Sequence, residues 1–407
     1  MRRFIFFISF FPSIIYGQHF LPIQHDTISY NHEIILNGMA NYSGNAIRVD
    51  LAKKLFYGGS INKELIDASS LNHNEINRFG MYLNSEVEYR NKQVNLFKNP
   101  NYGFVIKGGV YSYFDVLYPK GVYDLSLYGN SSYPGQEINL SATRASAFFF
   151  QKIGFGYIDK STNSSVSINL VNLSNYASLK ISDGYLYQSD DFDTVNLNLT
   201  GTGYLLDSPV FFNGIGASID ADLRIPVVTP KEDTINFQFK LCNFGFAHIY
   251  NSTDKYDMNK ELAYSGVNVN SALSGQSLFN NGFSVLDSLG IEKKESKRTV
   301  FLPGYLQMSK LINESSERSI EEFYGVRMFF SSAYNPLVFA GLNFKLGNRF
   351  NIGGCITYGG FASFSGGMYS SYNHRNISFS ISTENISGVF LNNAKGESII
   401  FRFRCAF

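Results

Sequence analysis

The chain has 407 residues, a formal net charge of +1 at neutral pH and a mean hydropathy of −0.09. The near-zero charge excludes the basic field of a nucleic-acid-binding protein, and the low hydropathy excludes a bundle of transmembrane helices. Only 16% of the residues are charged, another 16% are aromatic and Trp is absent, so any aromatic belt at a membrane interface would consist of the 27 Tyr and 38 Phe.

The first 17 residues have the layout of a secretory signal peptide. Two Arg residues precede a short run rich in Phe and Ile, a break at Pro12 and a small residue at Gly17. The apolar run is too short to span a bilayer as a helix, and no later stretch reaches ~18 apolar residues. We therefore expect an exported chain that is cleaved before Gln18, without the Cys that a lipoprotein signal requires at that point.

Residues 18–45 are polar and have no firm period, and we interpret them as an N-terminal arm or as a plug inside a barrel lumen. In residues 46–53, Ile47, Val49 and Leu51 alternate with other side chains, which favours a strand. We expect residues 46–407 to form the barrel itself.

Residues 78–90 are the clearest predicted strand. The odd-numbered positions are mainly apolar, and the even-numbered positions include Arg78, Glu86, Glu88 and Arg90. This run of 13 residues with a period of two exceeds the ~5–6 residues of an ordinary strand. Its length suits a strand that crosses a bilayer at a tilt, which takes about 9–11 residues.

Two long stretches interrupt the alternating pattern. Residues 114–141 include a short helical pattern that ends at Gly129, and residues 271–297 end in a run of charges. We expect both to be folded loops, either outside the barrel or tucked into its mouth. Shorter alternating runs lie before, between and after them, so that 14 to 16 spans are predicted in all.

The chain ends in a strand-like run in which Phe401, Phe403 and Phe407 alternate with Arg402 and Arg404. The last strand of a soluble sandwich could also place these charges in water. However, more than a dozen long aromatic faces are difficult to bury in one soluble core. In a membrane barrel the aromatic face meets lipid and the Arg face meets the lumen, which avoids the ~2–4 kcal/mol that Arg costs at the lipid midplane.

We therefore predict an all-β fold, a transmembrane antiparallel β-barrel with a polar lumen in the outer membrane of a Gram-negative cell. The aromatic residues of the terminal run, Phe401, Phe403 and Phe407, are the candidate signal for assembly. The candidate lumen-lining residues are the charges in the predicted strands: Arg78, Glu86, Glu88, Arg90, Asp220, Asp222, Arg224, Lys240, Arg327, Arg402 and Arg404.

Several short stretches, in this order, also resemble an uncharacterised outer-membrane β-barrel family, a domain of unknown function. That family is related in architecture to long-chain fatty-acid-transporter barrels and to outer-membrane subunits of type IX secretion. The resemblance implies about 14 strands and brings no catalytic residue with it, and His248 departs from it where Trp or Arg is expected. The matching stretches are residues 54–67, 77–80, 124–130 with 133–135, 212–220 and 239–246.

The sequence contains no convincing catalytic, metal or cofactor motif. Residues 183–193 and 254–261 are acidic but lack the EF-hand spacing, so solvated loops are a better interpretation than a Ca²⁺ site. The cysteines at 242, 355 and 405 are too far apart for a metal site or a disulfide framework. We expect a protein that is not an enzyme and has no cofactor.

Two functions remain open from the sequence. The first is a porin-like transport barrel or channel for a small or amphipathic ligand. The alternative is a structural or docking barrel whose long loops hold a partner in a secretion or envelope complex. The expected partners in either case are outer-membrane lipid and the barrel assembly machinery, with no nucleic acid.

Overall fold

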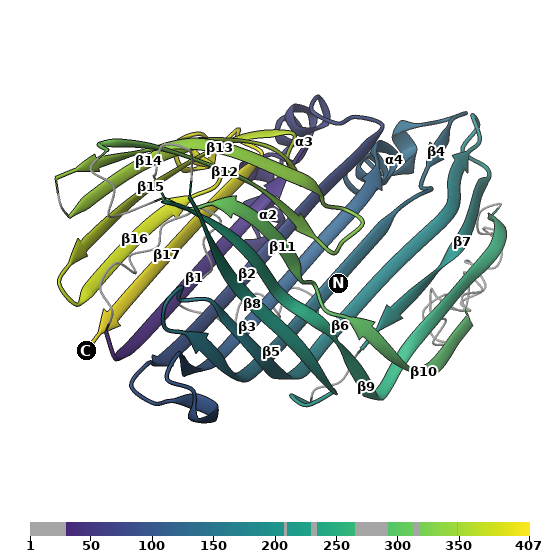
Figure 1. Cartoon of the computed structure of the whole chain (residues 1–407). Helices are drawn as coiled ribbons and strands as arrows, with labels where there is room; N and C mark the ends of the chain where they lie inside the picture. Colours follow the sequence, from purple (N-terminus) through teal and green to yellow (C-terminus); the bar gives the residue numbers. More distant parts are fainter. Residues whose placement is uncertain (1–29, 207–209, 229–233, 265–291, 313–317, 348) are drawn as a thin grey trace.

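The computed structural model describes residues 30–206, 210–228, 234–264, 292–312, 318–347 and 349–407. Antiparallel strands form one large sheet that curves round and closes on itself (Figure 1). The strands are β1 (His32–Gly44), β2 (Ile76–Asn91), β3 (Tyr102–Pro119), β4 (Glu137–Asn139), β5 (Arg144–Asp159), β6 (Ser165–Gln188), β7 (Val195–Leu205), β8 (Gly214–Val228), β9 (Thr234–Tyr264), β10 (Glu292–Phe301), β11 (Tyr305–Lys310), β12 (Ile320–Phe329), β13 (Asn335–Leu346), β14 (Phe350–Gly360), β15 (Phe364–His374), β16 (Ile377–Thr383) and β17 (Gly396–Ala406).

The first and last strands close the ring, because β1 pairs with β17 on one side and with β2 on the other. Two places in the wall are each shared by two strands that lie end to end. β7 and β8 both pair with β6 and β9, and β10 and β11 both pair with β9. The short β4 pairs with β6 alone. Within the part of the chain that the structure describes, the ring thus has 14 places, in agreement with the predicted size.

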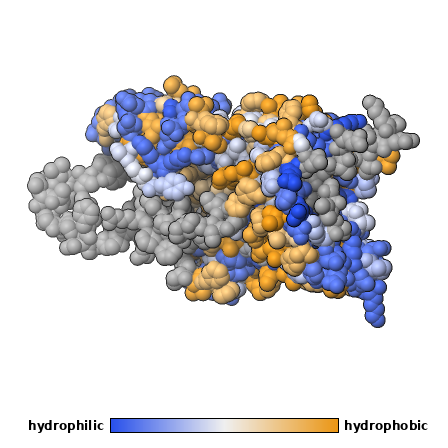
Figure 2. All heavy atoms as spheres, turned by 90° about the vertical axis from the view of Figure 1, so that its left-hand side faces the viewer, coloured by the Kyte–Doolittle hydropathy of each residue, from blue (hydrophilic) through white to orange (hydrophobic). Residues whose placement is uncertain are grey.

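The two faces of the wall have opposite character. Along β8, Ile215 and Ile219 are exposed on the outside, whereas Gly216, Ser218 and Asp220 are buried on the inside. Apolar residues gather in patches over the described part of the side shown in Figure 2. Apolar side chains outside and polar ones inside are the arrangement of a barrel that crosses a membrane. The chain is therefore an outer-membrane β-barrel, as the terminal strand and the strand periods predicted.

The two ends of the barrel differ in the length of their connections. At one end β5 is joined to β6, β13 to β14 and β15 to β16 by short turns, and the C-terminal strand also finishes here. The other end carries α2 (Val49–Tyr57), α3 (Lys63–Ser70), α4 (Lys120–Leu127) and α7 (Ile386–Phe390). The short helix η2 (Asn130–Ser132) also lies at this end, whereas η1 (Leu96–Lys98) lies at the end with the short turns. The labelled α3 and α4 lie at the upper edge in Figure 1, α2 lies below α3, and the C-terminus lies at the lower left.

Short turns are typical of the periplasmic side of such barrels and longer loops of the extracellular side. We therefore name the helical end the outer end and the other the inner end. Among the helices of the described ranges, none is long and apolar enough to cross a membrane.

Several predictions about local structure were wrong. Residues 32–44, expected in an arm or plug, form β1 in the wall, because Glu33 and Asn37 face inward where polar partners surround them. The rest of that expected arm, residues 18–29, lies outside the described residues. Residues 49–57 form helix α2 rather than a strand, since Leu51, Ala52 and Phe56 pack in one apolar cluster.

The two predicted loops are also shorter than expected. Residues 114–119 continue β3, and only then does the chain turn into α4 and β4. Residues 292–297 belong to β10, and residues 271–291 lie outside the described residues. In both cases an alternating pattern with charged side chains continues past the point where the apolar signal weakens.

Helices α2, α3 and α4 pack against the outside of β1–β3 at the outer end and form what we call the helical group. Outward-facing aromatic residues of the wall, among them Tyr42, Phe79 and Tyr118, are covered by this group. His73 lies between α3 and β2, with Nδ1 2.9 Å from the Ser69 carbonyl oxygen and Nε2 3.1 Å from the Tyr118 hydroxyl. Burial lowers the pKa of His73 below its ordinary value, although the Ser69 carbonyl opposes this effect.

Acidification is expected to loosen the helical group. Because the pKa of His73 is lower in the folded state than in the unfolded state, its contribution to stability is fully present above about pH 6.5 and is lost as the pH falls below that value and through the lower folded-state pKa. Limited proteolysis of the 58–75 connection in lipid-embedded barrel should be faster at about pH 5 than at about pH 8. The variant His73→Gln should lose this difference, and an unchanged pH dependence in that variant would contradict the assignment.

Candidate functional site

The candidate lumen residues all lie on inward-facing positions of their strands. Seven of them are buried: Glu86, Glu88, Arg90, Asp220, Arg224, Arg327 and Arg404. The other four are partly buried: Arg78, Asp222, Lys240 and Arg402. The sequence pattern led us to expect a wet lumen wall, whereas most of these charges are enclosed and contact charges of the opposite sign.

Nearest the inner end, buried charges form a network that we call the ion-pair belt. At its centre is Glu33 of β1, whose side chain is fully buried. A Glu33 carboxylate oxygen lies 2.8 Å from Lys92 Nζ and 3.1 Å from Arg404 Nη2, and the other lies 3.8 Å from Arg90 Nη1. The belt comprises Glu33, Glu86, Glu88, Arg90, Lys92, Lys107, Lys152, Asp220 and Arg404.

The belt continues round the inside of the wall from β2 to β8. Lys107 Nζ on β3 lies 3.1 Å from Glu88, and Lys152 Nζ on β5 lies 2.5 Å from Asp220 and 3.8 Å from Glu86. Such pairs compensate charges that would be costly to bury alone. The belt therefore makes this level of the lumen both ionic and closely packed.

The sequence reasoning missed several members of the belt. Lys107 and Lys152 lie in predicted strands. They occupy alternate positions that face inward, as Glu86 does, so the same reasoning would have identified them. Glu33 was missed because its segment was interpreted as an arm. Its partner Arg404 is 371 residues away in the chain, and no local pattern connects the two.

Above the belt, aromatic side chains meet across the lumen. Tyr82 and Tyr113 project from β2 and β3, and Phe329 from β12 on the far side of the ring. The Phe329 ring centroid is 5.6 Å from that of Tyr82 and 5.9 Å from that of Tyr113. We call the whole set the aromatic cluster: Tyr82, Tyr113, Tyr305, Phe329, Tyr334 and Phe361.

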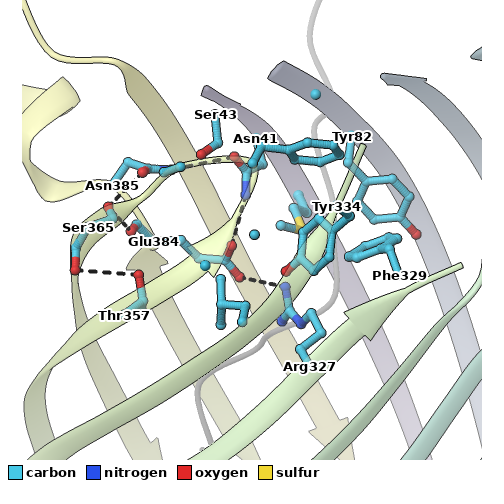
Figure 3. Close-up of a pocket in the computed structure, with 17 residues that line it drawn as sticks. Asn41, Ser43, Tyr82, Arg327, Phe329, Tyr334, Thr357, Ser365, Glu384 and Asn385 are labelled. Carbon is cyan, nitrogen blue, oxygen red and sulfur yellow. Dashed lines mark hydrogen bonds and ion pairs between the residues drawn. The ribbon is translucent and has the colours of Figure 1, made fainter. Parts of the chain in front are cut away.

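A small hollow lies between the aromatic cluster and the outer ends of β1, β14 and β15. Figure 3 shows Arg327 and Glu384 pointing toward each other, with Tyr82, Phe329 and Tyr334 to one side. Arg327 Nη1 lies 3.1 Å from Glu384 Oε1, and Asn41 Nδ2 donates to Glu384 Oε2 at 2.8 Å. The hollow has a volume of about 30 Å³, enough for about two water molecules.

The hollow combines apolar rings with a charged pair and several amides and hydroxyls. Burial raises the pKa of Glu384, which lies just beyond β16, above its ordinary value, and the neighbouring Arg327 opposes this rise. The lining suits a molecule with an apolar body and a polar group, but its size requires side chains to move before such a molecule enters.

The described residues hold no group of three or more His, Cys, Asp or Glu side chains placed to bind a metal ion. The free cysteines are Cys242 and Cys355, both buried on the inner face, and the partly buried Cys405. These residues pack within the wall, and we assign them no chemical role.

No family model matches the chain, and no curated protein matches it. Among solved structures, it is similar to the Pseudomonas putida toluene transporter TodX, with 9% identity, a TM-score of 0.42 and coverage of 95% of this chain and 93% of that one. The Ralstonia pickettii toluene transporter TbuX gives 12% identity, a TM-score of 0.41 and coverage of 95% and 92%. The translocator domain of the Neisseria meningitidis autotransporter NalP gives 9% identity, a TM-score of 0.32 and coverage of 94% of this chain and 90% of that one.

The toluene transporters are fatty-acid-transporter-like barrels, the architecture to which the resembled family is related, and the third neighbour is an autotransporter barrel. At such identities and scores the likeness concerns the fold alone, so function has to be argued from the geometry. The suggested relation to type IX secretion subunits and the expected partners stay predictions.

Proposed function

We propose that the protein transports a small amphipathic ligand from the outer end of the barrel into its interior and then sideways through the wall into the membrane. The observation that carries this proposal is an interruption of the wall between β7 and β8, which we call the wall break. It lies between Leu205, where β7 ends, and Gly214, where β8 begins, and the residues that the structure describes there are 206 and 210–213.

The wall break replaces regular strand pairing over several residues. β7 ends with Leu205 opposite Ala177 of β6, and β8 begins with Gly214 opposite Leu173. A side chain takes over part of the pairing, because Asn213 Nδ2 donates to the Ser174 carbonyl oxygen at 2.7 Å. Irregular backbone at membrane depth needs such substitute partners. Backbone bonds remain at its two edges, from Leu206 N to the Tyr176 carbonyl oxygen at 2.9 Å and from Asn213 N to the Leu173 carbonyl oxygen at 3.3 Å. The ladder is thus interrupted between these two bonds rather than continuous.

The surfaces on both sides of the wall break are apolar. Phe211 and Phe212 are more than half exposed on its outer side. Leu206, Ile249 and Leu302 are buried inside, in the same core cluster as several rings of the aromatic cluster. An amphipathic ligand leaving the aromatic cluster would therefore meet apolar surface on the inner and outer sides of the wall break, with the Asn213 amide between them.

The straight path along the barrel axis is less suitable for such a ligand. Below the aromatic cluster it would reach the ion-pair belt, where Glu33, Lys152 and Asp220 are buried in close pairs. An apolar group inserted there would separate charges without replacing their partners, which is costly in a buried setting. The belt thus favours the sideways exit.

A polar side chain at the wall break is expected to slow transport. Leu206→Asn would place an amide on the proposed route, whereas Ile400→Asn changes an equally buried residue of the same cluster on β17, away from the break. In Gram-negative cells that express either variant, uptake of N-phenyl-1-naphthylamine should fall several-fold for Leu206→Asn and much less for Ile400→Asn. Equal uptake by the two variants, with equal amounts of assembled barrel, would rule out this exit.

A further inference from the structure

The connection between β12 and β13, residues 330–334, turns into the lumen instead of projecting from the outer end. We call it the outer strap. Ala333 is only 2% exposed and Tyr334 only 8%. A five-residue turn at a barrel rim would ordinarily face water, as Phe330 and Ser332 still do. The burial of Ala333 and Tyr334 therefore means that this half of the turn bends over the lumen.

One hydrogen bond ties the outer strap to the far wall. The Ser331 hydroxyl donates to Asp115 Oδ2 of β3. β3 and β12 are six places apart in the ring of 14. This bond therefore connects strands on nearly opposite sides of the lumen. Asp115 also accepts hydrogen bonds from Ser146 of the adjacent β5 and, at 3.2 Å, from Tyr113.

Aromatic packing completes the closure beside that bond. The Tyr334 ring centroid lies 4.9 Å from that of Phe329 and 5.0 Å from that of Phe361. Phe361, from the turn after β14, lies over Gly80 of β2 so closely that a Cβ at position 80 would be 2.2 Å from its ring. Two turns at the outer end therefore reach across to β2 and β3, and a glycine makes the space for one of them.

We propose that the outer strap is a gate that closes the extracellular mouth and that the Ser331–Asp115 hydrogen bond holds it shut. Release of this bond would free the strap to swing away, carrying Tyr334 out of the aromatic cluster and widening the hollow beside Arg327. A hydroxyl–carboxylate bond at the end of a short turn is strong enough to favour one position and weak enough to exchange. The gate supplies the entry step of the proposed transport function.

The thiol of Cys242 can report the state of the gate. It is 3% exposed, faces the lumen on β9 and is opposite Tyr305 of the aromatic cluster. In a Cys355→Ser, Cys405→Ser background, a membrane-impermeant maleimide added from outside should label Cys242 several-fold faster when Ser331→Ala is introduced. Ser146→Ala is the matched control, because it also removes a hydroxyl donor to Asp115 but leaves the strap untouched.

The proposal predicts fast labelling for Ser331→Ala and slow, parent-like labelling for Ser146→Ala. Slow labelling in both variants, or equally fast labelling in both, overturns it. In planar bilayers, open events should likewise be more frequent for Ser331→Ala than for Ser146→Ala. Because Leu206→Asn alters only the exit, it should not change labelling of Cys242, so failure of the gate and failure of the sideways exit can be told apart.

Discussion

Replacement of Phe401 by Arg is expected to block assembly of the barrel, whereas Arg402→Gln should assemble normally. Phe401 lies at the middle of β17, paired with Gly38 of β1 and Ile381 of β16, and its ring centroid is 6.3 Å from that of Phe379. Its side chain is on the outer face of the strand and faces lipid. The Arg402 side chain is on the inner face, and the residue is paired with Asn37 and Ser380.

The expected size of the effect follows from the depth of Phe401. Arg on the lipid face at the midplane of a barrel costs about 2–4 kcal/mol, a large share of the ~5–15 kcal/mol that stabilises a typical protein. Phe401 is also part of the predicted assembly signal with Phe403 and Phe407, so the variant would weaken recognition as well. Arg402→Gln keeps a polar group in a polar lumen.

Heat-dependent migration in gels and fractionation of membranes would measure assembly of both variants. Folded barrel should be found for Arg402→Gln and little or none for Phe401→Arg. The reverse result would show that the two faces of β17 are exchanged. Phe401→Leu serves as the control for loss of the ring alone and should assemble.

The strand periods were the part of the fold that could be read from the sequence. In β2 and β17 the alternation of large apolar and charged residues extends over the whole strand, so the faces of residues such as Phe401 and Glu86 follow from parity. β1 was missed because its outward positions include Gly38 and Ala40, which give little apolar signal. Its place in the wall depends on pairing with strands from both ends of the chain.

The longest strands were also hard to predict. β6 and β9 run for 24 and 31 residues, and polar residues interrupt the alternating pattern of each. In the structure both continue past the outer end, where β4, β7 and β10 pair with them and polar side chains on both faces are acceptable. Where a strand continues beyond the outer end, its residues become polar on both faces. In the sequence this change looks like the end of the strand.

The candidate site was predictable only one residue at a time. Parity identified Arg327 as a residue of the inner face, but its partner Glu384 lies in a connection and faces it through tertiary folding alone. The outer strap gave no sequence signal, because Ser331 resembles any polar turn residue. Contacts across a lumen depend on the closure of the ring, which no local pattern encodes.

Loss of the Glu33 carboxylate is expected to destabilise the barrel strongly. In Glu33→Gln the side chain keeps its size but Lys92, Arg404 and Arg90 lose the buried carboxylate that they share. Removal of one partner from a buried ion pair typically costs about 3–5 kcal/mol, because the remaining charge is left uncompensated. Glu33 and Arg404 also lie on the two strands that close the ring, so the loss would act at the seam.

An exposed ion pair provides the control. Glu397 on β17 lies 2.6 Å from Lys53, and the two side chains are 37% and 48% exposed. Glu397→Gln should therefore cost no more than about 1 kcal/mol. Urea unfolding of both variants in lipid vesicles would compare the two losses. Adding Arg404→Gln to Glu33→Gln should recover part of the stability, because one uncompensated cation is removed.

The same experiment bears on the route through the barrel. If Glu33→Gln costs no more than Glu397→Gln, water must take the place of the carboxylate around Lys92 and Arg404, and the inner end of the lumen would be hydrated. A hydrated belt would offer a polar ligand an axial path and remove the reason for a sideways exit. A large loss instead shows a dry, closely paired belt, which an amphipathic ligand could avoid only by leaving through the wall break beside Leu206.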